Sequence, residues 1–136
     1  GSVPIVGVFN GCRYTDPTTG KETFSNFYPA STNASDIEAF VIDDPMAIFE
    51  IQADAAFPVA DLFGNFDIVY TSSGSTTTGL SGAELDVTTG ATTATLPLKA
   101  IDISKNVNND DVSSDATNVL VVIQNHIFGQ KSAGLA

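Results

Sequence analysis

The alternation of apolar residues in residues 37–54, IEAFVIDDPMAIFEIQAD, constrains the fold more than any other feature of the chain. Residues 37–42 are apolar at most positions on both alternating faces, which predicts a strand covered on both sides. After a turn at residues 43–45, apolar and polar positions alternate, which predicts a strand with one buried face and one solvent face. We therefore expect a β-hairpin, with residues 37–42 in the core or on a face that a neighbouring molecule covers.

Short strands recur along the rest of the chain, and no segment has the 3.6-residue periodicity of a helix. Strands at this spacing predict an all-β fold, a single-domain antiparallel β-barrel or β-sandwich (jelly-roll-like) with long polar loops. The pattern does not give the strand order, so barrel and sandwich both remain open. The further expected strands are residues 3–9, 12–15, 22–28, 67–70, 83–87, 96–103 and 119–128.

The segments between these strands are polar and turn-rich. Residues 16–20 (DPTTG) have the chemistry of a turn and predict a hairpin of residues 12–28. We assign residues 1–128 to one β domain and residues 129–136 to a flexible C-terminal tail. The other irregular segments are a turn or bulge at Asn10-Gly11, a helical turn or loop at residues 55–61, and exposed loops at residues 71–82 and 104–118.

The charge of the chain restricts its partners. Sixteen acidic residues face five basic ones, a formal net charge of −11, and no Lys or Arg lies between Glu22 and Leu98. This acidity repels a phosphate backbone or an anionic membrane, so we expect neither nucleic acid nor membrane as a partner. It either keeps the protein dispersed or complements a basic protein surface. No apolar run approaches the roughly 20 residues that span a bilayer, and no signal-peptide pattern opens the sequence.

Cys12 and His126 are single copies of residue types that usually act in groups. A lone cysteine forms no intramolecular disulfide and predicts a small buried hydrophobe. His126 has no accompanying G-x-S-x-G motif, so it predicts a strand-end histidine bonded to a loop. A zinc site normally needs several His or Cys ligands. We therefore expect no enzyme, no catalytic residues, and no cofactor or metal.

Acidic and amide side chains gather at two turns and on two strands. Asp43-Asp44 and residues 106–111 (NVNNDD) offer oxygen ligands for calcium, but they also have the composition of ordinary turns. Glu38 and Glu50 lie on neighbouring predicted strands, either as a carboxylate pair or as solvated groups beside the shared turn. We expect the turn and solvated roles.

An aromatic group and two glycines complete the candidates. The aromatic group is a patch for a sugar or a partner protein, or it packs the core of the first hairpin. Gly7 and Gly11 are four residues apart, but no helix follows them, so they do not predict a phosphate-binding loop. The members of the aromatic group are Tyr14, Phe24, Phe27 and Tyr28.

Four segments carry a resemblance to a known family. Together and in order they resemble a family of small structural proteins of tailed bacteriophages, abundant in marine phages. The match covers most of the chain, and the order of the segments is more specific than any one of them. The segments are PIVGVFNGCRYTDPTTGKETFSNFYP (residues 4–29), ASDIEAFVIDDPMAIFEIQAD (34–54), TTTGLSGAELD (76–86) and VLVVIQNHIF (119–128).

This resemblance implies a virion structural protein on the capsid exterior, as a decoration (cement) protein that stabilises the head. Its implied partners are the major capsid protein or copies of itself, with a homo-oligomer expected and a trimer favoured. The family offers no catalytic residues. The chain departs from the family pattern in two places: a further N-terminal stretch commonly precedes the region that begins at Pro4, and the loop at residues 106–115 is longer.

Two other functions remain open. The first is a subunit of an extracellular filament or tube, assembled by strand exchange through residues 3–9. The second is a carbohydrate-binding β-sandwich module that uses the aromatic group.

Overall fold

The strands of this protein form two separate sheets. The computed structural model describes residues 3–109, 111, 113–129 and 134. Within these residues the chain has eight strands and one 3-10 turn, η1 (Val59–Asp61). The strands are β1 (Val8–Thr15), β2 (Glu22–Ser25), β3 (Glu38–Ile42), β4 (Ile48–Gln52), β5 (Asn65–Val69), β6 (Glu84–Ala91), β7 (Leu98–Ile103) and β8 (Asn118–Ile123).

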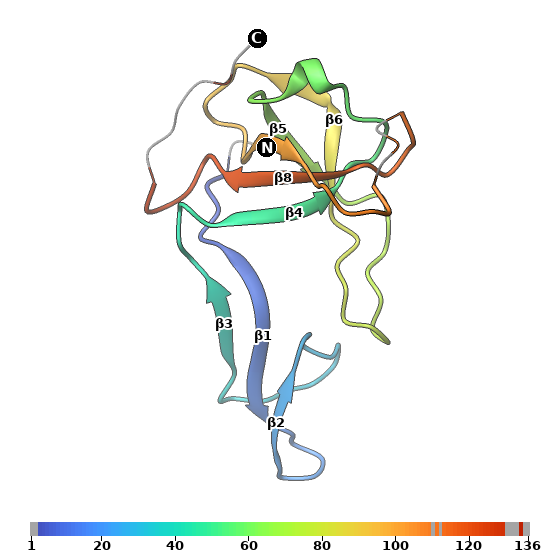
Figure 1. Cartoon of the computed structure of the whole chain (residues 1–136). Coiled ribbons are helices and arrows are strands. Elements are labelled where there is room, and N and C mark those ends of the chain that lie inside the picture. The colour runs from blue at the N-terminus through green and yellow to red at the C-terminus, as the bar shows by residue number, and fades with distance from the viewer. Residues whose placement is uncertain (1–2, 110, 112, 130–133, 135–136) are drawn as a thin grey trace.

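One sheet projects from the other (Figure 1). The first sheet has three strands in the order β2-β1-β3, and we call it, with its loops (residues 8–42), the arm. The second has five strands in the order β4-β8-β7-β5-β6 and, with its loops, forms the body. All strand pairs within both sheets are antiparallel. The arm is therefore a single layer of strands at one end of the molecule.

The hydrophobic core lies in the body. The body sheet curls, so that its two edge strands approach each other and Ala53, after β4, forms a bridge with Leu85 of β6. Phe57 and Phe66 are fully buried inside the curl, with ring centroids 5.4 Å apart. The other buried members of the core are Leu98, Ala100, Val119, Val121 and Ile123. These residues alternate along β7 and β8, which places one face of each strand inward.

The structure confirms an all-β antiparallel fold with long polar loops. Of the two architectures left open by the sequence, the fold is sandwich-like and is not a closed barrel. The alternation in β4 is also confirmed, since Phe49 and Ile51 are half-buried between exposed neighbours. The helical turn expected within residues 55–61 is present as η1.

The hairpin predicted for residues 37–54 is wrong. β3 pairs with β1 in the arm, whereas β4 pairs with β8 in the body. The turn at Asp43-Asp44-Pro45 is present, and Asp44 Oδ1 accepts a hydrogen bond from the Met46 N–H at 2.8 Å. Because this turn carries the chain from one sheet to the other instead of folding it back, the two strands never meet.

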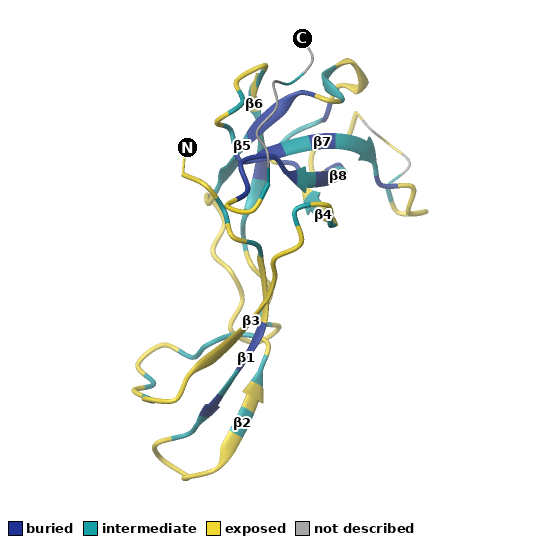
Figure 2. Cartoon of the chain, turned by 90° about the vertical axis from the view of Figure 1, so that its left-hand side faces the viewer, coloured by how far each residue is buried: buried dark blue, intermediate teal, exposed yellow. Residues whose placement is uncertain are grey.

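The prediction that residues 37–42 lie in the core is also wrong. All five residues of β3 are exposed (Figure 2). The apolar residues of β3 face solvent on both sides of the sheet, because none of the residues that the structure describes forms a second layer over this part of the arm. The other expectation for this strand, a face covered by a neighbouring molecule, stays a prediction.

The ends of several strands differ from the expected ones. Residues 3–9 are not one strand: Ile5 bridges to His126 of the body, and β1 begins at Val8. β8 ends at Ile123, because the N–H groups of Gln124 and Asn125 both bond to the Pro97 carbonyl. The expected bulge at Asn10-Gly11 is confirmed by a register shift within β1, where Gly11 has φ +117°.

The expected hairpin of residues 12–28 is confirmed by the pairing of β1 with β2. The expectation of one domain over residues 1–128 stays a prediction. Most of the predicted tail, residues 129–136, lies outside the described residues. Of its described members, Gly134 donates its N–H to the Thr92 carbonyl at 3.1 Å.

We expect the stability of the protein to depend on buried side chains of the body, such as Phe66, and not on exposed side chains of the arm. The Phe66→Ala variant removes a fully buried ring and should lower the free energy of unfolding by about 3–5 kcal/mol. The Phe24→Ala variant removes an exposed ring and should change it by less than about 0.5 kcal/mol. Urea denaturation of both variants measures the difference. Equal losses in the two variants would contradict the assignment of the core to the body.

Candidate functional site

The outer half of the arm covers one of its faces with its own loop. Cys12 and Tyr14 of β1 point to this face and are buried. The Tyr28 ring packs edge-on against Tyr14, with ring centroids 5.3 Å apart. Tyr28 Oη donates a hydrogen bond to the Thr32 carbonyl at 2.6 Å, which fixes the loop after β2 over this face. Cys12 is a free buried thiol, as expected, and donates weakly to the Phe27 carbonyl at 3.7 Å.

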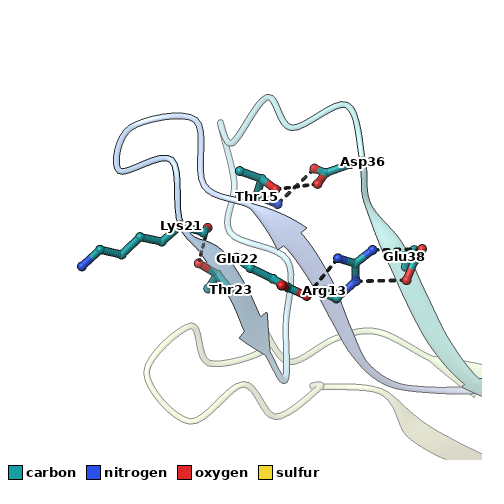
Figure 3. A network of polar contacts seen from close by, with 7 residues as sticks. All are labelled: Arg13, Thr15, Lys21, Glu22, Thr23, Asp36 and Glu38. Atoms are coloured by element: carbon teal, nitrogen blue, oxygen red, sulfur yellow. Dashed lines mark hydrogen bonds and ion pairs between the residues drawn. The ribbon is translucent and has the colours of Figure 1, made fainter.

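The opposite face of the arm carries an ion-pair network across its three strands (Figure 3). Arg13 of β1 lies between Glu22 of β2 and Glu38 of β3. Its Nη1 is 2.9 Å from Glu22 Oε1, while its Nε and Nη2 bind the two oxygens of Glu38 at 3.1 and 3.0 Å. The hydrogen bonds from Arg13 lower the pKa of Glu38 and raise that of Arg13 itself. This network links all three strands of the arm.

A second polar contact extends the pairing of β1 and β3. Asp36 precedes β3, and its carboxylate accepts hydrogen bonds from Thr15 N–H at 3.0 Å and from Thr15 Oγ1 at 2.6 Å. These two bonds from Thr15 hold the pKa of Asp36 below its ordinary value. The contact fixes the chain at the outer end of β3.

The inner half of the arm leaves apolar side chains exposed on both faces. β2 pairs only with residues 12–15, so β1 and β3 run as a two-stranded ribbon closer to the body. Five apolar side chains of this ribbon are between 39% and 46% exposed, and they alternate between its two faces. A two-stranded ribbon in water is only marginally stable by itself. We call this set the apolar ribbon: Val8, Phe9, Phe40, Val41 and Ile42.

A shallow groove separates the arm from the loop of residues 71–82. The groove has a volume of about 460 Å³ and is lined in part by Phe9, Phe27 and Leu80. Asn26 Nδ2 spans it at one point, with a hydrogen bond of 2.8 Å to the Thr78 carbonyl. The loop is otherwise exposed, as its sequence predicts.

The four residues of the aromatic group have different roles. Tyr14 and Tyr28 pack the hairpin, which is the structural role expected for them. Phe27 is half-buried beside the groove. Phe24, by contrast, is 68% exposed. It is the cross-strand partner of Arg13 and shares its face, which is the face away from Tyr14. The group therefore does not form one patch.

His126 lies where the arm joins the body. It is only 2% exposed and follows the end of β8, and its Nδ1 accepts a hydrogen bond from the Phe128 N–H at 3.0 Å. Its Nε2 therefore carries the proton, and no acceptor for it lies among the described residues. Ile5 binds the backbone on both sides of this histidine, at Asn125 and Ile127. His126 is thus a structural residue of the junction, bonded as a strand-end histidine.

The structure separates the two glutamates of the neighbouring predicted strands. Glu38 binds Arg13 in the arm, whereas Glu50 accepts a hydrogen bond from Ser104 Oγ at 3.0 Å in the body. The carboxylate pair, which was the less favoured alternative, does not form, and the turn does not bring the two glutamates together, because β3 and β4 belong to different sheets.

The acidic clusters act as turn residues where they are described. Asp111 Oδ1 accepts hydrogen bonds from the N–H and the hydroxyl of Ser113, and these bonds lower its pKa. Asn109 closes the loop before β8 by donating to the Ser104 and Asn118 carbonyls. In the part of the chain that the structure describes, no three His, Cys, Asp or Glu side chains come together as a metal site.

Sequence reasoning missed the residues that organise the arm. Arg13, Asp36 and Asn26 were not candidates, because their partners depend on strand register and on a contact across 52 positions. One signal was available for Arg13, which is the only basic residue among residues 1–20. A single cation inside an acidic β-rich segment is a candidate for a cross-strand ion pair.

In comparisons with known proteins, no family model matches the chain, and no curated protein or solved structure matches it significantly. Among the described residues, no helix has the length and hydrophobicity that crossing a membrane requires.

The ion-pair network predicts a pH dependence of the arm. The pKa of Glu38 lies below its ordinary value of 4.5, so the folded arm releases this proton more readily than the unfolded arm. The stabilisation is complete above pH 4.5 and is lost as the pH falls through the lower pKa of the folded arm. In a carboxyl NMR titration, the Arg13→Met variant should raise the Glu38 midpoint toward 4.5.

Asp111 provides the control for this titration, because its low pKa comes from Ser113 and not from Arg13. Its midpoint should be the same in the parent protein and in Arg13→Met. A Glu38 midpoint that does not move in the variant would contradict the network.

Two substitutions at His126 should lower the free energy of unfolding by different amounts. His126→Ala removes a buried ring and the acceptor for the Phe128 N–H, and we expect a loss of about 2–4 kcal/mol in the free energy of unfolding. His126→Asn keeps an acceptor for the N–H two residues ahead, so its loss should be smaller by about 1 kcal/mol. Chemical denaturation measures both, and equal losses would show that the bond to Phe128 contributes nothing.

Proposed function

We propose that this protein is a virion structural protein of a tailed bacteriophage, which decorates the capsid exterior and stabilises the head through protein–protein contacts. The observation that carries the proposal is the apolar ribbon on a projecting arm. Exposed apolar side chains that gather in one place are typical of protein interaction sites. A projecting arm of this kind extends the reach of the protein toward a neighbouring subunit.

The surface charge supports the same role. A chain with a net charge of −11 stays dispersed before assembly and repels nucleic acid. This negative charge favours a partner that presents a basic patch, because opposite charges guide two surfaces together. We propose the major capsid protein as this partner, with copies of the chain itself, favoured as a trimer, completing the assembly.

The alternative of a filament joined by strand exchange receives less support. Its exchanging segment, residues 3–9, is occupied within its own chain. Ile5 N–H donates to the Asn125 carbonyl at 2.8 Å, and Val8 and Phe9 pair with β3. Releasing this segment would break both the junction and the arm.

The carbohydrate-binding alternative keeps one supporting observation, the groove beside Phe9 and Phe27. Aromatic rings at a groove offer flat apolar surfaces of the kind on which a sugar ring stacks. We propose carbohydrate binding as the second candidate function. A glycan array tests it, with Phe27→Ala expected to abolish any signal that the parent protein gives.

The capsid proposal is tested by co-expression with the major capsid protein encoded by the same genome. The protein should co-sediment with the assembled shells. Phe40→Ser in the apolar ribbon should weaken this binding at least about tenfold, as expected for an apolar ring that the partner buries. Tyr70→Ser, which changes a ring outside the arm that is 72% exposed against 42% for Phe40, should leave binding unchanged. Absence of the parent protein from the shells, or equal effects of the two variants, would contradict the proposal.

A further inference from the structure

The outer edge of β3 is an open sheet edge. In the order β2-β1-β3, no strand lies beyond β3 among the described residues. Its central residues, Ala39 to Ile42, include no charge and no proline. Natural proteins usually block exposed sheet edges with such residues, because an open edge pairs readily with another strand. The β2 edge differs, since it has only four residues and begins with Glu22.

Two contacts define which backbone groups of β3 point outward. The Thr15 N–H reaches Asp36 beside β3, so the backbone groups of Arg13, two residues earlier, also point toward β3. The backbone groups of Glu38, the partner of Arg13, then point toward β1. Those of Ile42 do the same, because its carbonyl oxygen lies so close to Gly7 that a Cβ at Gly7 would clash with it. By alternation, the N–H and C=O groups of Ala39 and Val41 point to the open edge.

The charges around β3 indicate what kind of strand fits there. Asp36 and Glu38 lie at its outer end, and Asp43 and Asp44 follow its inner end. An apolar strand is therefore bounded by acidic residues on both sides. An incoming strand with the same pattern of apolar residues and basic residues at both ends would match it.

Charge disfavours a second copy of β3 at this edge when the two strands overlap over their full length. In the antiparallel pairing that places Phe40 opposite Phe40 of the copy, each Asp36 stands opposite an Asp44. Like charges directly opposed on neighbouring strands destabilise the pair. The edge therefore favours a different molecule over self-pairing.

We propose that β3 accepts an extended apolar segment, flanked by Lys or Arg, which a partner protein adds as a fourth strand of the arm sheet. The added strand bonds to the outward groups of Ala39 and Val41. Its alternate side chains cover Phe40 and Ile42 on one face and Val41 on the other. This inference names the binding mode of the arm and rests on the proposed role in assembly.

A synthetic peptide tests the edge directly. The nine-residue peptide KKVTVTVKK matches the stretch from Asp36 to Asp44 in length and has complementary charges. We expect it to bind the intact protein, and the acidic peptide EEVTVTVEE to bind at least roughly tenfold more weakly. Equal binding of the two peptides, or no binding of the basic one, would overturn the proposed charge match.

A proline variant tests the backbone pairing. Val41→Pro removes an outward N–H, which an edge strand tolerates, and should reduce binding of KKVTVTVKK at least about tenfold. Phe24→Pro places proline on the β2 edge of the same sheet and serves as the matched control, with binding unchanged. Amide NMR spectra report whether each arm stays folded. Unchanged peptide affinity in a folded Val41→Pro variant would overturn the inference.

Capsid binding separates this inference from the proposed function. If the parent protein binds shells and the folded Val41→Pro variant binds them equally well, the strand-addition inference fails and the capsid role stands. If the peptide binds at β3 but the shells do not bind, the capsid role fails and the edge site stands.

Discussion

A single layer of strands cannot cover both of its faces, and the arm is such a layer. The loop after β2 covers one face of the outer half, over Cys12 and Tyr14. The inner half keeps apolar side chains 39–46% exposed, because β2 does not extend that far along β1. The body buries its own hydrophobic core, with Phe57 and Phe66 inside a curled sheet. The molecule is thus a body with its own buried core, which carries a sheet whose inner half exposes apolar side chains.

The fold could be predicted as far as local patterns specify it. The alternation in residues 48–54 gives β4, and the apolar run at residues 119–123 gives β8. Strand pairing could not be predicted, because the turn chemistry of residues 43–45 is the same for a hairpin and for a crossing between sheets. The sandwich-like arrangement follows from these long-range pairings and has no local signal.

The candidate site was harder to predict for a different reason. A strand that a partner covers has the same apolar pattern as a strand in a core, so the sequence of residues 37–42 leaves both arrangements open. The pattern does not distinguish a strand covered by its own chain from one covered by a partner, and the described residues leave β3 exposed. The network of Arg13 depends on the register of three strands, which the sequence does not contain.

The central claim is that β3 presents an open edge that a partner closes. Amide hydrogen exchange resolved by residue measures this most directly, in the free protein and in its complex with shells or with KKVTVTVKK. In the free protein, the amides of Ala39 and Val41 should exchange fast and that of Ile42 slowly, and in the complex all three should be protected. Ala39 and Val41 amides that are protected in the free monomer, or that still exchange fast in the complex, would contradict the account.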